Sequence, residues 1–105
     1  MTFYETDIFT AQIVELIDDD SYAELQSVLV GDPEAGDLIP RSKGLRKIRW
    51  RAKGKGKRGG MRVIYYLVDQ EEIFMLYAYS KSKQEDITPA RAKILRDLVD
   101  QHLEQ

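Results

Sequence analysis

Arg62 is the residue of this 105-residue chain whose type and position suit chemistry best. It lies near the start of Met61 to Val68, a segment that is otherwise apolar on both faces of a predicted strand. A charged group at such a place must find a partner or face a groove. A guanidinium on a rigid strand suits phosphate, because its fork binds two oxygens at once. The alternative is a structural ion pair between Arg62 and an acid of the N-terminal helices.

Three lysines, Lys53, Lys55 and Lys57, crowd a glycine-rich loop beside Arg58. Neighbouring like charges and partial burial lower the pKa of a lysine, and such a lysine can act as a general base near neutral pH. The alternative is that all three stay charged and only bind phosphate. The loop GKGKRGG lacks the Gly-Lys-Ser/Thr ending of a nucleotide-binding phosphate loop and joins two strands, so a nucleotide cradle is not predicted.

Tyr77 and Tyr79 share one face of the predicted strand Ile73 to Ser80, and Lys81 follows that strand. Such a pair is either part of the core or, for Tyr79, a surface on which a nucleic-acid base can stack. His102, the single histidine, is expected to be solvated. With one histidine and no cysteine, neither a metal nor another cofactor is predicted.

The charges are separated along the chain. Residues 41–66 hold eleven of the sixteen lysines and arginines and no acid, whereas residues 1–40 hold ten acids and no base. The net charge of −2 hides this asymmetry, which points to a nucleic acid or an acidic partner. The alternative is a solvated surface on which the charges are sorted by accident.

The N-terminal part of the chain predicts a short edge strand, Thr2 to Glu5, and an amphipathic helix after it. Thr6 or Asp7 can cap this helix, and Asp18 to Asp20 should end it. Its apolar face has helical spacing and consists of Phe9, Ile13, Leu16 and Ile17.

A second helix is predicted by the capping-box spacing of Ser21 and Glu24, with Ser21 as N-cap. Gly31 should close it in a left-handed conformation. Three strands and a helix complete the chain: Leu45 to Ala52, Met61 to Val68, Ile73 to Ser80, and a helix capped by Thr88 with Pro89 at its first position. The order β-α-α-β-β-β-α predicts a small α+β domain containing an antiparallel meander.

The chain is expected to form one domain, residues 1–105. It has no apolar run of about eighteen residues and no signal-peptide pattern at its start. We therefore expect a cytoplasmic location, without contact with a membrane.

Three segments of the chain, GLRKIRW, GKGKRGGMRVIYYL and LYAYSKSKQEDIT, resemble the RelE/HigB family of toxins, particularly its HigB-like branch. FYETDIFTAQI and DPEAGDLIP also fit, and the resemblance runs from about Phe3 to Leu98. It implies a twisted antiparallel sheet with a two-helix hairpin packed on one face and a C-terminal helix.

The resemblance also implies a function. Members of this family are ribonucleases that cleave mRNA in the ribosomal A site and are held inactive by a cognate antitoxin. Matched position by position, the strand arginine that stabilises the scissile phosphate is Arg62, and the basic residues before that strand are Lys53, Lys55 and Lys57. The basic residue after the last strand is Lys81, with Lys83 as a second candidate. Some relatives have an arginine and a later tyrosine there. In this chain the basic residues between Ser80 and Arg91 are lysines alone, and no tyrosine follows Tyr79.

Each step of RNA cleavage can then be assigned to a residue. RNA supplies its own nucleophile, the 2′-hydroxyl, so no serine or cysteine is needed. Lys55 or Lys57 would be the base, Arg62 would supply electrostatic stabilisation, and Lys81 would be the acid or a second clamp. The product would be a 2′,3′-cyclic phosphate. The residues predicted to bind RNA or the ribosome are Arg46, Lys47, Arg49, Arg51, Lys53, Arg58, Tyr79 and Lys83.

Two other functions fit the same fold, because fold does not fix function. One is a gyrase poison, as in the ParE relatives. The other is an RNA-binding module without catalysis, in which the lysines only hold phosphate. The dense Lys/Arg loop favours the nuclease.

Overall fold

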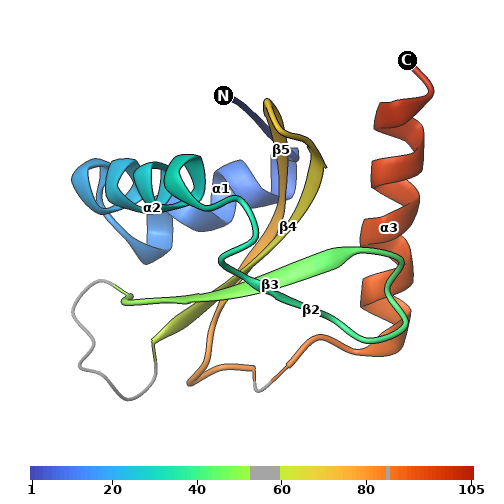
Figure 1. Ribbon diagram of the computed structural model, residues 1–105. Helices are drawn as coiled ribbons and strands as arrows, with labels where there is room; N and C mark the ends of the chain where they lie inside the picture. Colours follow the sequence, from blue (N-terminus) through green and yellow to red (C-terminus); the bar gives the residue numbers. More distant parts are fainter. Residues whose placement is uncertain (53–59, 85) are drawn as a thin grey trace.

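A five-stranded twisted sheet forms the centre of the molecule (Figure 1). The computed structural model describes residues 1–52, 60–84 and 86–105. The elements along the chain are β1 (Thr2–Glu5), α1 (Asp7–Leu16), α2 (Asp19–Gly31), β2 (Asp37–Leu38), β3 (Leu45–Trp50), β4 (Met61–Asp69), β5 (Glu72–Ser80) and α3 (Pro89–Leu103).

The strands lie in the order β1-β5-β4-β3-β2, so β4 is the central strand. The predicted α+β fold is confirmed, with α1 and α2 on one face of the sheet and α3 on the other (Figure 1). Two details differ from the prediction. The short strand β2 adds a fifth strand, and β1 pairs with β5 in parallel while the other pairs are antiparallel. Two strands joined directly by a hairpin must be antiparallel. β1 and β5 are far apart in the sequence and are not joined by a hairpin, so they can pair in parallel.

The first residues of the helices explain where they start. Thr6 caps α1 by accepting a hydrogen bond from the backbone N–H of Phe9, and Thr88 caps α3 with Pro89 in its first turn, both as predicted. The prediction for α2 was wrong, because Asp18 is its N-cap and accepts from the backbone N–H of Ser21 at 2.8 Å. Aspartate caps as well as serine does, and the earlier start places further acids in the first turn, where the helix dipole favours them.

Gly31 does not close α2 in a left-handed conformation. It is the last helical residue, and Asp32 follows in a conformation with φ −149°. Among the described residues, those with positive φ lie in the loop before β3: Arg41 and Lys43 at 60° and Gly44 at 104°.

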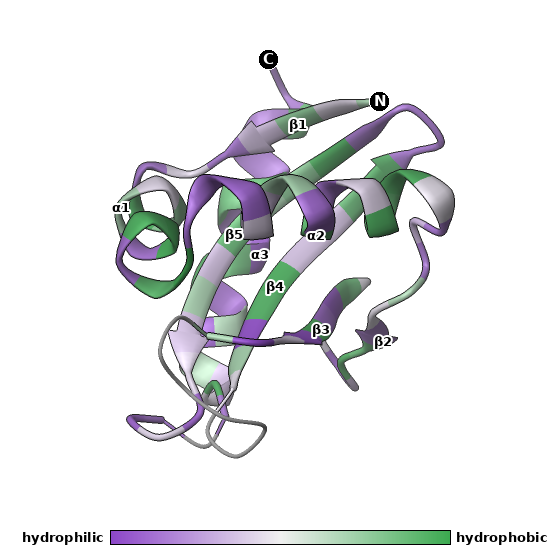
Figure 2. Cartoon of the chain, turned by 90° about the vertical axis from the view of Figure 1, so that its left-hand side faces the viewer, coloured by the Kyte–Doolittle hydropathy of each residue, from purple (hydrophilic) through white to green (hydrophobic). Residues whose placement is uncertain are grey.

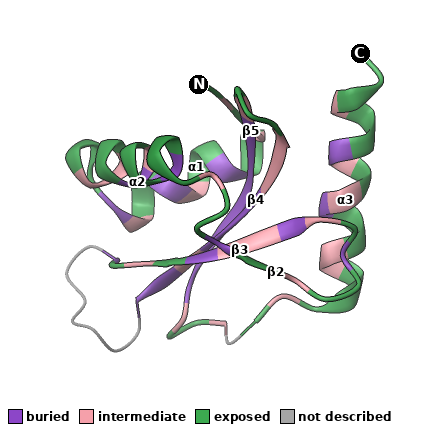
Figure 3. Cartoon of the chain, in the orientation of Figure 1, coloured by how far each residue is buried: buried purple, intermediate pink, exposed green. Residues whose placement is uncertain are grey.

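The two faces of the sheet carry separate apolar clusters. The cluster beneath α1 and α2 includes Phe9, Ile13 and Leu25 with Val63 of β4, and the cluster beneath α3 includes Leu95 and other α3 residues with further residues of the strands. Hydrophobic residues recur along β4 and β5 (Figure 2), and buried residues concentrate on the same strands (Figure 3). The sheet is therefore covered on both sides near its middle. In the described parts of the chain, no helix is both long and apolar enough to cross a membrane.

Candidate active site

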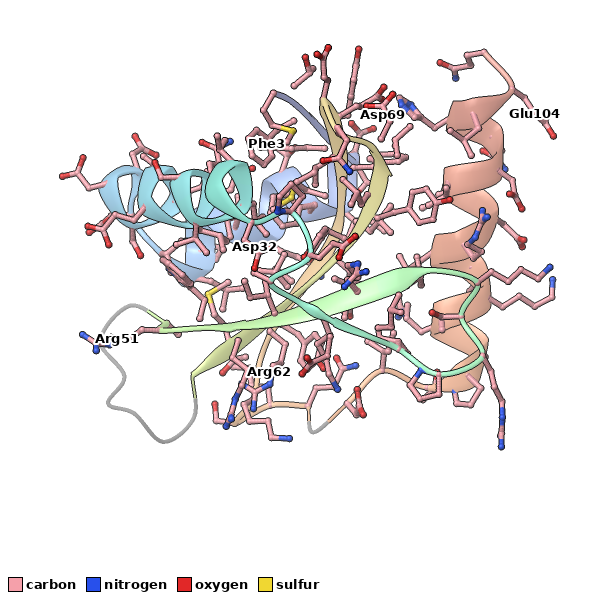
Figure 4. All side chains as sticks on the ribbon, viewed as in Figure 1. Phe3, Asp32, Arg51, Arg62, Asp69 and Glu104 are labelled. Atoms are coloured by element: carbon pink, nitrogen blue, oxygen red, sulfur yellow. The ribbon has the colours of Figure 1, made fainter. Side chains whose placement is uncertain are left out.

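Strand β4 positions Arg62. Met61 and Val63 beside it are fully buried in the cluster beneath α1 and α2, so alternation along the strand directs Arg62 to the opposite face. Arg62 is half-buried there, and its Cα partners are Arg49 of β3 and Tyr79 of β5. Arg49, Arg62 and Tyr79 thus form a row of paired positions across β3, β4 and β5, and Figure 4 shows where Arg62 lies in the sheet.

The contacts of Arg62 do not include an acid. Its Nη1 donates to the backbone carbonyl of Met61 at 3.1 Å. Within residues 1–52, 60–84 and 86–105, Arg62 forms no ion pair, and α1 and α2 lie on the other face of the sheet. The alternative of an ion pair with the N-terminal helices is therefore wrong. The guanidinium keeps donors that a phosphate can use.

A β-bulge in β5 decides which side chains stand next to Arg62. Ile64 pairs with Tyr77, but Tyr65 pairs with Met75, so Leu76 has no partner in β4. Such an extra residue shifts the alternation of the strand by one position.

The side chains of β5 follow this shift. Met75 and Ala78 pack in the cluster beneath α1 and α2, whereas Leu76, Tyr77 and Tyr79 pack in the cluster beneath α3. The rings of Tyr77 and Tyr79 have centroids 5.9 Å apart. The predicted shared face of the two tyrosines is confirmed, and it is the face of Arg62.

Asp86 accepts hydrogen bonds from three donors next to the row formed by Arg49, Arg62 and Tyr79. Its Oδ1 accepts from Lys47 Nζ at 3.2 Å, from the Tyr79 hydroxyl at 3.3 Å and from the backbone N–H of Ile87 at 2.8 Å. Burial alone would raise the pKa of Asp86, but the hydrogen bonds from Ile87 and Lys47 outweigh it and lower the pKa overall. Burial and the Asp86 carboxylate raise the pKa of Tyr79 to about 12. At neutral pH this site therefore holds an aspartate anion and a protonated phenol.

Gly60 and Lys81 join the ends of the three strands. The backbone N–H of Lys81 donates to the carbonyl of Gly60 at 2.8 Å. A Cβ on Gly60 would lie 2.7 Å from the carbonyl oxygen of Trp50, so only glycine fits this close approach. The lysine after β5 is thereby tied to the start of β4, one residue before Met61.

Comparison with known protein families matches residues 39–105 to the family described as the RelE toxin of the RelE/RelB toxin–antitoxin system. The matched residues form more than half of the chain and include every described member of the row around Arg62. The chain belongs to the RelE toxin family. It is therefore a toxin of a toxin–antitoxin system, from a family of endoribonuclease toxins, and an antitoxin is its implied partner. Its place in the HigB-like branch stays a prediction.

The structure brings some of the predicted site residues of the toxin together and separates others. Lys47, Arg49 and Tyr79 lie on the face of Arg62, and Lys81 follows β5 beside Gly60. The predicted catalytic lysines Lys55 and Lys57, with Lys53 and Arg58, lie outside the described residues.

Three predicted RNA-binding residues lie elsewhere. Arg46 is on the opposite face of β3, where its Nη1 donates to the carbonyls of Glu34 at 3.3 Å and Gly36 at 2.8 Å. Arg51 follows β3 and points away from Arg62 (Figure 4), and Lys83 is exposed in the turn after β5. Arg46 therefore holds the loop after α2, and we leave it out of the proposed site.

Tyr79 has little free surface. It is 5% exposed, with its ring against Tyr77 and its hydroxyl on Asp86. Tyr77 is 8% exposed and lies under the guanidinium of Arg91, whose Cζ is 4.9 Å from the ring centroid. Stacking of a base on Tyr79 would need an open ring face, which this packing does not leave.

His102 is not simply solvated, as the sequence suggested. Its Nε2 is 2.6 Å from Glu72 Oε2, and its ring lies 4.8 Å from that of Tyr4 and 4.5 Å from that of Phe74. These contacts attach the end of α3 to β1 and β5, far from Arg62. No group of three or more His, Asp or Glu side chains suited to a metal ion occurs within the ranges that the structure describes.

Sequence reasoning missed Asp86. Its partners Lys47 and Tyr79 are 39 and 7 residues away, so no local pattern joins the three. The available signal was an acid two residues before the Thr88-Pro89 helix start, immediately after a lysine-rich turn.

Proposed function

We propose that this toxin is a ribosome-dependent endoribonuclease that cleaves mRNA in the A site and so stops translation. The observation that carries the proposal is the position of Arg62. It stands on the central strand, beside Arg49 and Tyr79, with no acid neutralising it among residues 1–52, 60–84 and 86–105. Membership of a family of endoribonuclease toxins supports the same reaction class.

The role proposed for Arg62 is to stabilise the transition state. The 2′-oxygen attacks the adjacent phosphorus while the bond from phosphorus to the 5′-oxygen breaks, and the phosphorane between them carries extra negative charge. A guanidinium can contact two of its oxygens, and a positioned charge of this kind is commonly the largest catalytic contribution. Arg49, directly opposite on β3, adds positive charge to the same face.

Two proton transfers complete the reaction. The proton of the 2′-hydroxyl passes to Lys55 or Lys57, and the leaving 5′-oxygen takes a proton from Lys81 or from the protonated Tyr79. The products are a 2′,3′-cyclic phosphate and a free 5′-hydroxyl. The phenol of Tyr79 is protonated at neutral pH, but its pKa of about 12 makes it a weaker acid than a free tyrosine, so Lys81 is the first candidate for this step. Lys47, which forms an ion pair with Asp86 at 3.2 Å, is proposed as a further phosphate contact.

The ribosome supplies what this small site lacks. Alignment of the 2′-oxygen, phosphorus and 5′-oxygen in line can contribute roughly 7–11 kcal/mol, and mRNA in the A site is held by the ribosome itself. The proposed partners are therefore mRNA and ribosomal RNA for the reaction and the antitoxin for inhibition, all in the cytoplasm. No metal ion or other cofactor has a step in this proposal.

Purified ribosomes programmed with a defined mRNA test this function. The wild-type toxin should give cuts in phase with the A-site codon, mapped by primer extension, and the 3′ ends should carry a cyclic phosphate. Arg62→Ala should give none, whereas Arg51→Ala should cut at the wild-type rate when toxin is saturating, because Arg51 points away from the site. Gyrase-dependent DNA breaks without mRNA cuts would identify a gyrase poison, and RNA binding with neither would identify a binding module; both results would overturn the proposal.

A further inference from the structure

The bulge of β5 is held from outside the sheet by α1. β1 ends at Glu5, opposite Met75, so beyond that point β5 has no neighbouring strand on that side. Backbone groups left without a partner in a buried place cost free energy and are nearly always satisfied by something else. Here Thr6 and the first turns of α1 satisfy them.

Three hydrogen bonds replace the missing strand. The backbone N–H of Thr6 donates to the carbonyl of Met75 at 3.1 Å, and the Thr6 hydroxyl donates to the carbonyl of Leu76 at 2.8 Å. The third comes from the other direction: the backbone N–H of Ala78 donates to Oε1 of Gln12 at 2.8 Å. Gln12 is half-buried and lies 66 residues from Ala78 in the sequence. These contacts span the bulge from its first residue to its last.

The positions of these groups follow the shifted alternation of the strand. A regular strand turns the backbone groups of every second residue to the same side. The carbonyl of Met75 faces α1, yet the next groups that face α1 belong to Leu76 and Ala78. Gln12 therefore meets an N–H that points toward it only while the bulge is present. Without the bulge, Tyr77 and Tyr79 would alternate with Leu76 and share the face of Met75, away from Arg62.

We infer that Gln12 is a positioning residue for the site: its side-chain carbonyl holds the bulge, and through the bulge it keeps Tyr77 and Tyr79 beside Arg62. Gln12 itself touches no proposed substrate or reacting atom, because it lies on the α1 side of the sheet. The inference rests on the proposed function for its effect on cleavage, but the effect on the bulge is independent of any activity.

Gln12→Met and Gln12→Glu form the test. Methionine keeps the length of the side chain but lacks a good acceptor, whereas glutamate keeps an oxygen that can accept from Ala78. Gln101→Met is the matched control, since Gln101 is an exposed glutamine of α3 whose side chain makes no hydrogen bond to the described residues. Each purified protein is measured by amide hydrogen exchange at Ala78, by contacts between the Tyr77 and Tyr79 rings in NMR spectra, and by single-turnover cleavage on programmed ribosomes.

In Gln12→Met, exchange at Ala78 should be at least about tenfold faster, the contacts between the tyrosine rings should be lost, and the cleavage rate at saturation should fall about 10- to 100-fold. The concentration of ribosomes that gives half the maximal rate should stay within about twofold of the wild-type value, because Gln12 lies on the α1 side of the sheet, away from Arg49 and Arg62. Gln12→Glu should restore most of the exchange protection at Ala78, the ring contacts and the cleavage rate. Gln101→Met should match the wild type in all three.

A Gln12→Met protein with wild-type exchange at Ala78 and an unchanged cleavage rate would overturn the inference, and so would equal losses in Gln12→Met and Gln12→Glu. If wild-type toxin cleaves nothing, the proposed function fails, and the exchange and ring contacts alone decide the role of Gln12.

Discussion

Arg62 shows how a single charged residue on a central strand is kept available for function. The neighbouring strand positions are buried on the α1–α2 face, so Arg62 cannot turn toward the acids of the N-terminal helices. Arg62 is half-buried and lies on the face of the sheet that also carries Lys47 and Arg49. The alternation along β4 that buries Met61 and Val63 therefore also sets the direction of Arg62. Replacing Arg62 should then affect the proposed function more than the stability of the fold.

We expect Arg62→Ala to lower the single-turnover rate of mRNA cleavage by about 10²–10³, as for loss of one electrostatic donor. Arg62→Lys should recover little, because an ammonium group cannot form the two-pronged contact. Both proteins should unfold within a few degrees of the wild type, since no ion pair of Arg62 is broken in the described structure. Thermal midpoints and cleavage rates of the three proteins check this, and an active Arg62→Ala protein would exclude the assignment.

Tyr79 gives a prediction at high pH. Its pKa is raised to about 12 in the folded protein, against about 10 for an unfolded tyrosine. The native state therefore holds this proton more tightly, so the resulting stability is fully present below about pH 10 and is lost as the pH rises toward about 12.

One such group changes the free energy of unfolding by up to about 1.4 kcal/mol per pH unit in that window. Tyr79→Phe should therefore flatten the fall in stability between about pH 10 and about pH 11, measured by urea unfolding. It should not abolish the fall, because burial also raises the pKa of Tyr22 and of Tyr65. Identical slopes in Tyr79→Phe and wild type would show that Tyr79 does not titrate as its burial requires.

At the scale of elements, the toxin joins its site through close approaches of strand ends. Gly60 has the carbonyl of Trp50 2.7 Å from where its Cβ would be, and its own carbonyl accepts from Lys81. Gly31, at the end of α2, has nothing within 4 Å of the same position and no positive φ. The two glycines therefore predict opposite effects of the same substitution.

Gly60→Ala should destabilise the toxin by about 1–3 kcal/mol, because the backbone of β3 must move to admit the methyl group. Gly31→Ala should raise stability by up to about 1 kcal/mol, because alanine favours the helix and meets no neighbour. Urea unfolding of both variants measures the difference. A Gly60→Ala protein as stable as Gly31→Ala would mean that the ends of β3 and β4 are not held as closely as the structure shows.

The order and type of elements could be predicted because their signals are local. Apolar spacing, the caps Thr6 and Thr88 and the position of Pro89 all act within one helical turn. Arg62 could be proposed as a candidate for the same reason, as a charged residue in an apolar strand. Ser21 failed as a cap because the helix already starts after Asp18, whose side chain accepts from the backbone N–H of Ser21 and so places Ser21 inside the first turn.

The remaining features depend on contacts between distant residues. The parallel pairing of β1 with β5, the bulge at Leu76 and the meeting of Lys47 with Asp86 each join parts of the chain that no local pattern connects. Gln12 is the extreme case, since nothing in its own helix distinguishes it from an ordinary polar position. These features decide which side chains share the face of Arg62, so the sequence could propose Arg62 as a candidate but could not predict its neighbours.

At the scale of the whole molecule, acids and bases are separated along the chain. Residues 1–40 carry the acids of α1 and α2, while the bases of residues 41–66 include those of β3 and β4. Arg49 and Arg62 lie on the face away from α1 and α2, so the acidic hairpin does not neutralise them. This separation gives a small protein of net charge −2 a surface that can attract a polyanion.

Binding to ribosomes or to single-stranded RNA should therefore weaken steeply with salt. Each phosphate contact contributes about −0.7 to the slope of log affinity against log salt concentration on a single strand. Arg49→Ala should make the slope shallower by about that amount, because Arg49 faces the site. Lys93→Ala is the matched control: Lys93 is an exposed base of α3, outside the basic segment, and its loss should leave the slope unchanged. Affinities measured between low and moderate salt for the three proteins decide the matter, since a wild-type slope near zero, or equal slopes for Arg49→Ala and wild type, would mean that this face does not meet phosphate.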